Sequence, residues 1–185
     1  MASLSRRAAL ALTAATIAGL AAHRVEAASS AEAIDARIDR ALEELFATVA
    51  GARDLYDNAK GVLVMPGVVS GGLLIGGAYG EGALRINGQS VAYYSMAAAS
   101  IGFQIGIQST KQALFFMTDR ALERFRAADG WEIGADAQVT FPGDGIGVNL
   151  RSTTVNAPIV AVVFGQDGLL AGASLQGAKY SLISR

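Results

Sequence analysis

The spacing of apolar residues changes near residue 60, from a helical period to an alternating one. Over residues 29–50 the apolar positions recur at steps of three and four, which places them on one face of an amphipathic helix. Ser29 and Glu32 have the spacing of a capping box at the start of this helix. Gly51 interrupts the pattern, and residues 52–59 predict a short second helix. The apolar stripe of the first helix consists of Ile34, Ile38, Leu42, Leu45, Phe46 and Val49.

Beyond residue 60, large apolar residues alternate with glycine or polar residues, as expected of half-buried strands. Asn87-Gly88 is a residue pair typical of a two-residue hairpin turn. Thr118 predicts the N-cap of one late helix over 119–128, with Leu122 and Phe125 facing inward. Strand patterns occupy residues 83–86, 89–94, 100–108, 131–141, 146–150, 158–164 and 169–175.

Residues 61–80 form an uncharged window of 20 residues, which is long enough to span a membrane as a helix. Pro66 and seven glycines within this window favour two buried strands around a turn instead. A small outer-membrane barrel is a further alternative, but the acidic first helix and the few aromatic residues disfavour it. The sequence therefore predicts an α+β fold. Its sheet is antiparallel, strongly curved or barrel-like, with about nine or ten strands, an N-terminal amphipathic helix and one late helix.

The first 27 residues have the layout of an export signal. Arg6 and Arg7 form a positive start, residues 8–22 are uncharged and mostly apolar, and Val25 and Ala27 place small residues before the cleavage point. An amphipathic surface helix is the alternative for this segment. We expect residues 1–27 to be removed, through the Sec or the twin-arginine route, and residues 28–185 to form a single periplasmic or secreted domain.

The expected mature chain contains no Cys and no His, because the only histidine is His23. This composition excludes Cys/His and Ser/His nucleophiles and the usual zinc ligands, so we predict no metal site and no cofactor. Loss of the signal leaves 12 basic and 15 acidic residues. That balance argues against a nucleic-acid partner, since domains that bind nucleic acids carry a basic surplus.

The glycine-rich stretch 71–80 lacks the spacing of a phosphate-binding loop, so its glycines indicate bulges or close packing within strands. Carboxylate pairs can perform acid–base catalysis without histidine. No pair here has a spacing that identifies such an enzyme, so we predict no catalytic residue. Glu81, which lies between two glycines, is the acid whose presence is least explained by a turn or a surface position. The acids considered are Glu81, Glu132, Asp136, Asp144 and Asp167.

Five basic residues lie within predicted strands or at their ends: Lys60, Arg85, Lys111, Arg151 and Lys179. They form either a solvated face or a site for anionic groups, because Arg and Lys are the residues that contact phosphate. As candidates for contact with lipid headgroups we select Lys60, Arg85, Lys111 and Lys179.

Four segments, in this order, carry a resemblance to a known family: 59–66 (AKGVLVMP), 75–82 (IGGAYGEG), 102–108 (GFQIGIQ) and 167–175 (DGLLAGASL). Together they resemble the signatures of the SYLF domain and cover nearly the whole expected domain. The resemblance implies a non-enzymatic lipid-binding module. Members of this family occur in eukaryotic membrane-trafficking and actin-regulating proteins and among exported bacterial proteins.

The sequence thus leads to one main hypothesis and two alternatives. The main hypothesis is a non-enzymatic lipid-binding or membrane-associating domain of the bacterial cell envelope, peripheral to the membrane, with anionic phospholipid or another amphiphile as its partner. The apolar stripe of the first helix then either closes one side of the sheet or detaches onto a membrane. The alternatives are a structural module that binds an envelope protein and a carboxylate-based hydrolase that uses Glu81. The oligomeric state stays open.

Overall fold

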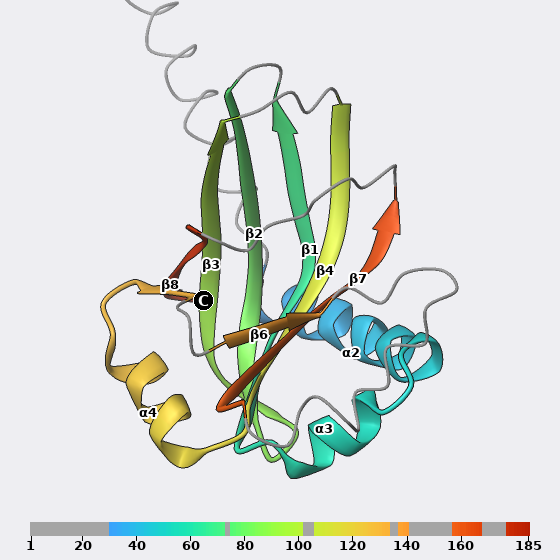
Figure 1. Cartoon of the computed structure of the whole chain (residues 1–185), viewed down its shortest axis with the longest axis vertical. Helices are drawn as coiled ribbons and strands as arrows, with labels where there is room; N and C mark the ends of the chain where they lie inside the picture. Colours follow the sequence, from blue (N-terminus) through green and yellow to red (C-terminus); the bar gives the residue numbers. More distant parts are fainter. Residues whose placement is uncertain (1–29, 73–74, 102–105, 134–136, 141–156, 168–176) are drawn as a thin grey trace, which may run out of the picture. The chain divides into compact units, whose positions relative to one another are not determined.

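The structure is a computed structural model, which describes residues 30–72, 75–101, 106–133, 137–140, 157–167 and 177–185. Residues 31–185 form one compact α+β unit (Figure 1). The helices in the described part of the chain are α2 (Ala31–Thr48), α3 (Ala52–Asn58) and α4 (Asp119–Ala127). The strands are β1 (Gly61–Gly72), β2 (Ile75–Ile86), β3 (Gln89–Ile101), β4 (Gly106–Phe116), β5 (Trp131–Glu132), β6 (Ala137–Thr140), β7 (Ile159–Asp167) and β8 (Lys179–Ile183).

All of these strands belong to one sheet, in the order β5-β8-β3-β2-β1-β4-β7-β6. Seven strands pair antiparallel, and β6 is added parallel to β7 at one edge. Strands β1, β2 and β3 follow one another, and β4 returns to lie beside β1, which is a Greek-key arrangement. The antiparallel sheet is confirmed. The eight strands of the described residues are fewer than the nine or ten predicted, and the strands expected over 146–150 and 169–175 lie outside those residues.

The sheet is strongly curled, which follows from the short link between its two edges. Glu132 ends β5 at one edge and Ala137 begins β6 at the other. A fully extended chain covers at most about 18 Å over this interval. The edges of a flat sheet of this width would lie about 34 Å apart. The sheet must therefore bend until its edges approach each other, as the prediction of a strongly curved sheet required.

Two of the predicted strands are wrong. The alternating run 100–108 is divided between the end of β3 at Ile101 and the start of β4 at Gly106, and these strands are not neighbours in the sheet. The run 131–141 is likewise divided between β5 and β6, at opposite edges. Alternation of apolar and small residues shows only that successive side chains point to opposite faces of a strand. It therefore cannot show where one strand stops and the next begins.

The turns and helix ends match the sequence well. Asn87 and Gly88 both have positive φ, 52° and 78°, as a tight hairpin turn between β2 and β3 requires. The Thr118 side chain accepts a hydrogen bond from the amide of Ala121 at 3.2 Å and caps α4. Leu122 on this helix is buried, as predicted.

Strand β1 contains an irregularity between Val64 and Val68, where its pairing with β2 shifts register. Gly82 on β2 lies against this point, and a Cβ there would overlap the carbonyl oxygen of Val64. A Cβ at Gly80 would lie 2.7 Å from the carbonyl oxygen of Gly67. Glycine is therefore required where the two backbones approach closely.

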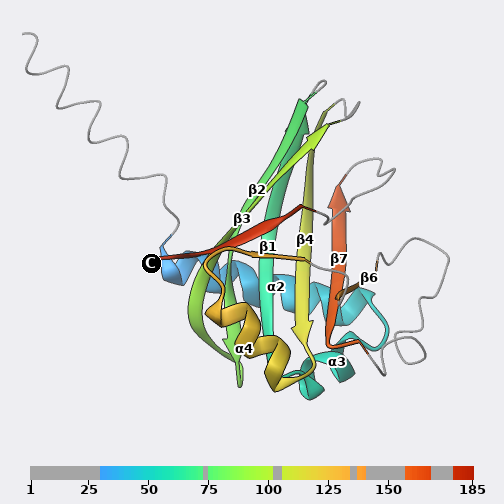
Figure 2. The same ribbon diagram turned by 60° about the vertical axis from the view of Figure 1, so that its left-hand side comes forward.

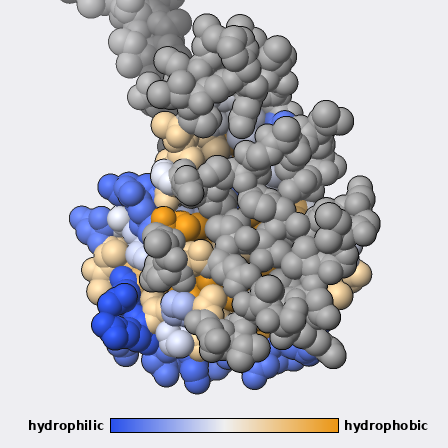
Figure 3. Space-filling model, viewed as in Figure 1, coloured by the Kyte–Doolittle hydropathy of each residue, from blue (hydrophilic) through white to orange (hydrophobic). Residues whose placement is uncertain are grey.

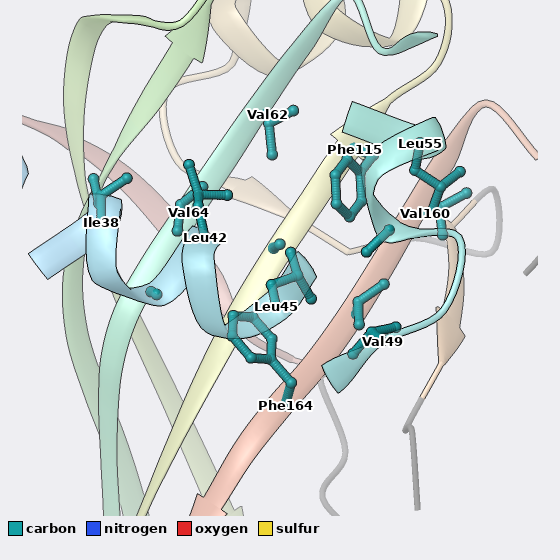
Figure 4. Close-up of a cluster of buried hydrophobic side chains, with 14 of the residues drawn as sticks. Ile38, Leu42, Leu45, Val49, Leu55, Val62, Val64, Phe115, Val160 and Phe164 are labelled. Carbon is teal, nitrogen blue, oxygen red and sulfur yellow. The ribbon is translucent and has the colours of Figure 1, made fainter. Parts of the chain in front are cut away.

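Each face of the sheet carries its own core. We call the face covered by α2 and α3 the outer face and the face covered by α4 the inner face (Figures 1 and 2). Figure 4 shows Ile38, Leu42 and Leu45 of α2 lying over residues of β1, β4 and β7 on the outer face. An aromatic cluster fills the inner face: Tyr94, Phe116, Phe125, Trp131 and Tyr180.

Candidate functional site

Two of the four headgroup candidates are bound to acidic residues of α2. Nη1 of Arg85 donates to a carboxylate oxygen of Asp39 at 2.6 Å. Nζ of Lys111 donates to both carboxylate oxygens of Glu44, at 2.9 and 3.1 Å. These ion pairs attach α2 to β2 and to β4, on either side of β1. The charges of Arg85 and Lys111 are therefore already compensated within the domain.

Asp35 adds two hydrogen bonds from hydroxyl groups to the same attachment, and its Oδ1 lies 3.9 Å from Nη2 of Arg85. Its carboxylate accepts from the hydroxyl of Ser90 at 2.6 Å and from that of Tyr93 at 3.0 Å. Burial of the phenol and its hydrogen bond to Asp35 raise the pKa of Tyr93. The outer-face acids thus hold the helix in place, and this role could not be read from their positions in the sequence.

The other two candidates, Lys60 and Lys179, are exposed and form no ion pair with any residue that the structure describes. Lys60 precedes β1, where its amide donates to the carbonyl of Phe116 at 2.8 Å. Lys179 begins β8, and its side chain lies against Gly130. The fold therefore does not gather the four candidates into one basic site.

One cleft of about 210 Å³ lies where α3 meets the β2–β3 turn. Arg85 lines it together with Ala59 and Gly61, so the chain on both sides of Lys60 borders the same hollow. Nε of Arg85 is buried without a hydrogen-bond partner among the described residues. Asp57 also lines the cleft, and Asp39 already compensates Arg85, so the cleft has no surplus of positive charge that would bind an anion. Its full lining is Tyr56, Asp57, Ala59, Gly61, Val62, Arg85, Asn87 and Gly88.

Glu81, the carboxylate that the sequence explained least, has two partners. Its Oε1 accepts a hydrogen bond from the Tyr79 hydroxyl at 2.8 Å and pairs with Nη2 of Arg185 at 2.5 Å. The hydrogen bond to Glu81, followed by burial, raises the pKa of Tyr79. Glu81 thus links β2 to the residues that follow β8, which gives this acid a structural role.

Other acidic candidates show no clustering that suggests chemistry. Glu132 is exposed on β5, Asp167 ends β7, and Asp136 and Asp144 lie outside the described residues. Within the described ranges no group of three or more His, Cys, Asp or Glu residues is arranged to hold a metal ion. No helix in that part of the chain is both long and apolar enough to cross a membrane.

The apolar stripe of α2 is packed against the sheet, with Ile34, Ile38 and Leu45 fully buried. Phe46 is half-buried at the corner with α3, where its ring meets Tyr56 edge-on at 5.4 Å and Arg53 stacks over it. The side of α4 that faces solvent is charged, and Figure 3 shows hydrophilic residues gathered over this helix.

A different surface is apolar and exposed. Val69 on β1 and Tyr79 on β2 lie opposite each other in register, and each is 54% exposed. Ala97 on β3 follows Tyr79 in the same row. Val68, Ala78 and Met96, the residues beside them along the strands, pack in the inner core, so Val69, Tyr79 and Ala97 belong to the outer face. Strands β1–β4 extend past α2 at this end (Figures 1 and 2). Site reasoning from the sequence missed this row. Its signal is the scarcity of charge over residues 61–110, where Glu81 and Arg85 are the only charged residues.

Comparison with known families gives one finding. Residues 97–182 match the family model described as "Ysc84: Las17-binding protein actin regulator". This range runs from the end of β3 through most of β8 and includes the segments 102–108 and 167–175, two of the four that suggested a family in the sequence. No curated protein matches the chain.

Proposed function

This chain belongs to the SYLF family, whose model its residues 97–182 match, and from that premise we propose that it is a non-enzymatic domain that associates with phospholipid membranes. Its setting in this proposal is the bacterial cell envelope, where loss of residues 1–27 would release it as a peripheral protein. The family model is described as an actin regulator, a role that we do not propose for this chain. Family membership supports a role in binding, and the surface of the sheet supports an apolar partner.

The observation that carries the proposal is the lack of free charge on the central strands. Over residues 61–110 the two charged side chains are both compensated, Glu81 by Arg185 and Arg85 by Asp39. The same strands expose Val69 and Tyr79. Exposed apolar surface of this kind commonly marks a contact with a membrane or another protein.

The helix α2 stays packed in this proposal and does not detach onto the bilayer. Its stripe buries Ile34, Ile38, Leu42 and Leu45 almost completely, and Val49 beyond the helix end is 5% exposed. At about 1.5–3 kcal/mol for each large side chain, detachment would cost roughly 10 kcal/mol before the ion pairs are counted. The acidic exposed side of α2 would also meet an anionic membrane unfavourably.

Lys60 and Lys179 are the candidates whose charge is available for contact with headgroups, since Arg85 and Lys111 are paired with acids of α2. Exposed lysines near an anionic bilayer contribute about 1 kcal/mol each. We assign them a supporting role that depends on headgroup charge.

Vesicle flotation tests the proposal. The protein should float with phosphatidylcholine vesicles and float more completely when phosphatidylglycerol is added. The double variant Lys60→Glu, Lys179→Glu should lose that increase without a change in Tm, because both residues are exposed. A matched control, Arg120→Glu with Arg124→Glu on α4, makes the same charge change elsewhere and should still float more completely when phosphatidylglycerol is added. Failure of the unmodified protein to float with either vesicle would reject the proposal.

A structural module that binds an envelope protein is the second candidate, because the exposed row at Val69 and Tyr79 also suits a protein partner. Flotation of the purified protein separates the two functions. A lipid-associating domain floats alone, whereas a domain that needs a protein partner stays at the bottom of the gradient.

A further inference from the structure

We propose that the end of the sheet beyond α2 is the surface that enters the headgroup region of a phospholipid bilayer. We call it the distal end, and it comprises residues 67–72, 75–81, 95–101 and 106–110 of strands β1–β4 (Figures 1 and 2). This inference rests on the proposed function and specifies which part of the domain makes the contact.

The distal end carries little charge, and that charge lies along its rim. Glu81 is the single charged residue in its four segments, and it lies on the side nearest α2, paired with Arg185. Two charged residues of the neighbouring strands border these segments, Lys179 of β8 opposite Ala97 and Asp167 of β7 opposite Ser109. A charged side chain placed deep in a bilayer costs about 2.5–3.5 kcal/mol on insertion scales. The helices, in contrast, expose charged residues such as Glu43 on α2 and Arg120 on α4.

The backbone of the distal end would also tolerate entry past the headgroups, where hydrogen-bond partners become scarce. Strand β1 is paired on both sides up to its last residue, since Gly72 lies opposite Gly76 on β2 and Gly106 on β4. Strand β2 is likewise paired with β3 as far as Ile75 and Ile101. Unpaired backbone groups cost several kcal/mol in a bilayer, and continuous pairing of the central strands avoids this cost.

The exposed side chains of the distal end suit a membrane interface. Val69 and Tyr79 form a cross-strand pair, and the neighbouring Gly77, Ala97 and Ala99 are small and exposed. The Tyr79 hydroxyl donates to Glu81, two residues closer to α2 along β2, so the polar atom lies on the side that stays in water. Tyrosine is enriched at membrane interfaces because it combines an apolar ring with a polar tip.

The sequence at this end agrees with the surface. The segments that join β1 to β2 and β3 to β4 contain no charged residue, and neither do the flanking residues of the strands. Contact through such a surface should depend little on salt or on headgroup charge. Lys179, opposite Ala97 at the rim of this surface, adds a contribution that depends on anionic lipid.

Site-specific labelling tests the contact directly, because the chain has no native cysteine. A nitrobenzoxadiazole (NBD) label on Ala99→Cys should show a blue shift and a several-fold rise in emission on addition of phosphatidylcholine vesicles. The same label on Arg120→Cys, exposed on α4, should show neither. A response at Arg120→Cys without one at Ala99→Cys would overturn the inference.

A charge-insertion pair provides the second measurement. Val69→Asp should weaken binding to phosphatidylcholine vesicles about tenfold or more, because the new carboxylate must enter the interface. Val91→Asp is the matched control, since Val91 is 49% exposed near the β2–β3 turn at the opposite end of β3, and its vesicle affinity should be unchanged. Equal affinities of both variants and the unmodified protein would overturn the inference while leaving the proposed function intact.

The same variants identify the other possible occupants. If the protein is a dimer in sedimentation experiments without vesicles and Val69→Asp makes it monomeric, the distal end is an interface between two copies and the inference is wrong. If the unmodified protein does not float at all, the proposed function is wrong, and the NBD emission should not change at either position.

Discussion

Arg85 on β2 donates a 2.6 Å hydrogen bond to Asp39 on α2, a residue 46 positions earlier in the chain. Lys111 on β4 makes the equivalent pair with Glu44 one turn and a half further along the helix. Two of the four basic residues selected as headgroup candidates, Arg85 and Lys111, are therefore counter-ions of the domain's own acidic helix. Arg85 and Lys111 are therefore not free to meet a membrane, whereas the strands beyond α2 expose uncharged side chains.

The first prediction concerns the attachment of α2. Asp35→Ala removes the acceptor of the Ser90 and Tyr93 hydroxyls, so we expect the free energy of unfolding to fall by about 1–3 kcal/mol. Urea denaturation measures this change. Glu43→Ala removes an exposed acid from the same helix and should alter the free energy by no more than about 0.5 kcal/mol. Equal losses in both variants would show that Asp35 is no anchor.

The second prediction concerns the irregular pairing of β1. Gly82→Ala places a Cβ against the carbonyl oxygen of Val64, a backbone atom that cannot move aside without disturbing the sheet. We expect a loss of about 3 kcal/mol or more, or failure to fold. Gly77→Ala is the control, because the nearest atom to its Cβ is the carbonyl oxygen of Ala98 at 3.6 Å, an ordinary contact. Thermal unfolding of the two variants should differ clearly, and similar Tm values would contradict the close approach.

The third prediction concerns the buried hydrogen bond of the inner core. The Tyr180 hydroxyl donates to Oε1 of Gln112 at 3.0 Å, and both residues are buried. Tyr180→Phe should lower the free energy of unfolding by about 1–3 kcal/mol, because the Gln112 oxygen loses its partner. In a double-mutant cycle with Gln112→Leu, the two losses should be less than additive. Strict additivity would mean that the two groups do not interact.

The fourth prediction concerns alkaline pH. Burial raises the pKa of Tyr180 well above its usual value, so the folded state favours the neutral phenol. The stabilisation that follows is complete below the ordinary tyrosine pKa of about 10 and is lost as pH rises above it. The free energy of unfolding should therefore decline above about pH 10, and Tyr180→Phe should show a shallower decline. A pH dependence identical in the two proteins would contradict this assignment.

The sequence predicts the local features of this fold well, because short-range chemistry determines them. The stripe from Ile34 to Leu45 has helical spacing, Asn87-Gly88 has the positive φ values that its turn needs, and Thr118 caps α4. Each of these features depends on residues a few positions apart. The two strands predicted for the window 61–80 are confirmed, since proline and glycine disfavour a helix there, but they are not buried throughout, because Val69 and Tyr79 are exposed.

The remaining features depend on contacts between distant residues. The run 131–141 becomes two edge strands because Trp131 pairs with Tyr180 and Ala137 pairs with Ile159. The sequence does not predict strand β8, since its five residues contain one buried position, Tyr180, and no clear alternation of buried and exposed residues. The ion pairs that bind the headgroup candidates also join residues far apart in the chain. No spacing rule links such positions, so the sequence could not show that two of the four candidates, Arg85 and Lys111, are paired with acids of α2.

Hydrogen exchange by mass spectrometry on the unmodified protein, with and without phosphatidylcholine vesicles, would show which part of the domain meets the bilayer. Exchange should become slower on vesicle addition over residues 67–72, 75–81 and 95–101 and stay unchanged over residues 31–48. Faster exchange over residues 31–48 with no change in the strands would contradict this prediction. That result would mean that the amphipathic helix leaves the sheet to meet the membrane.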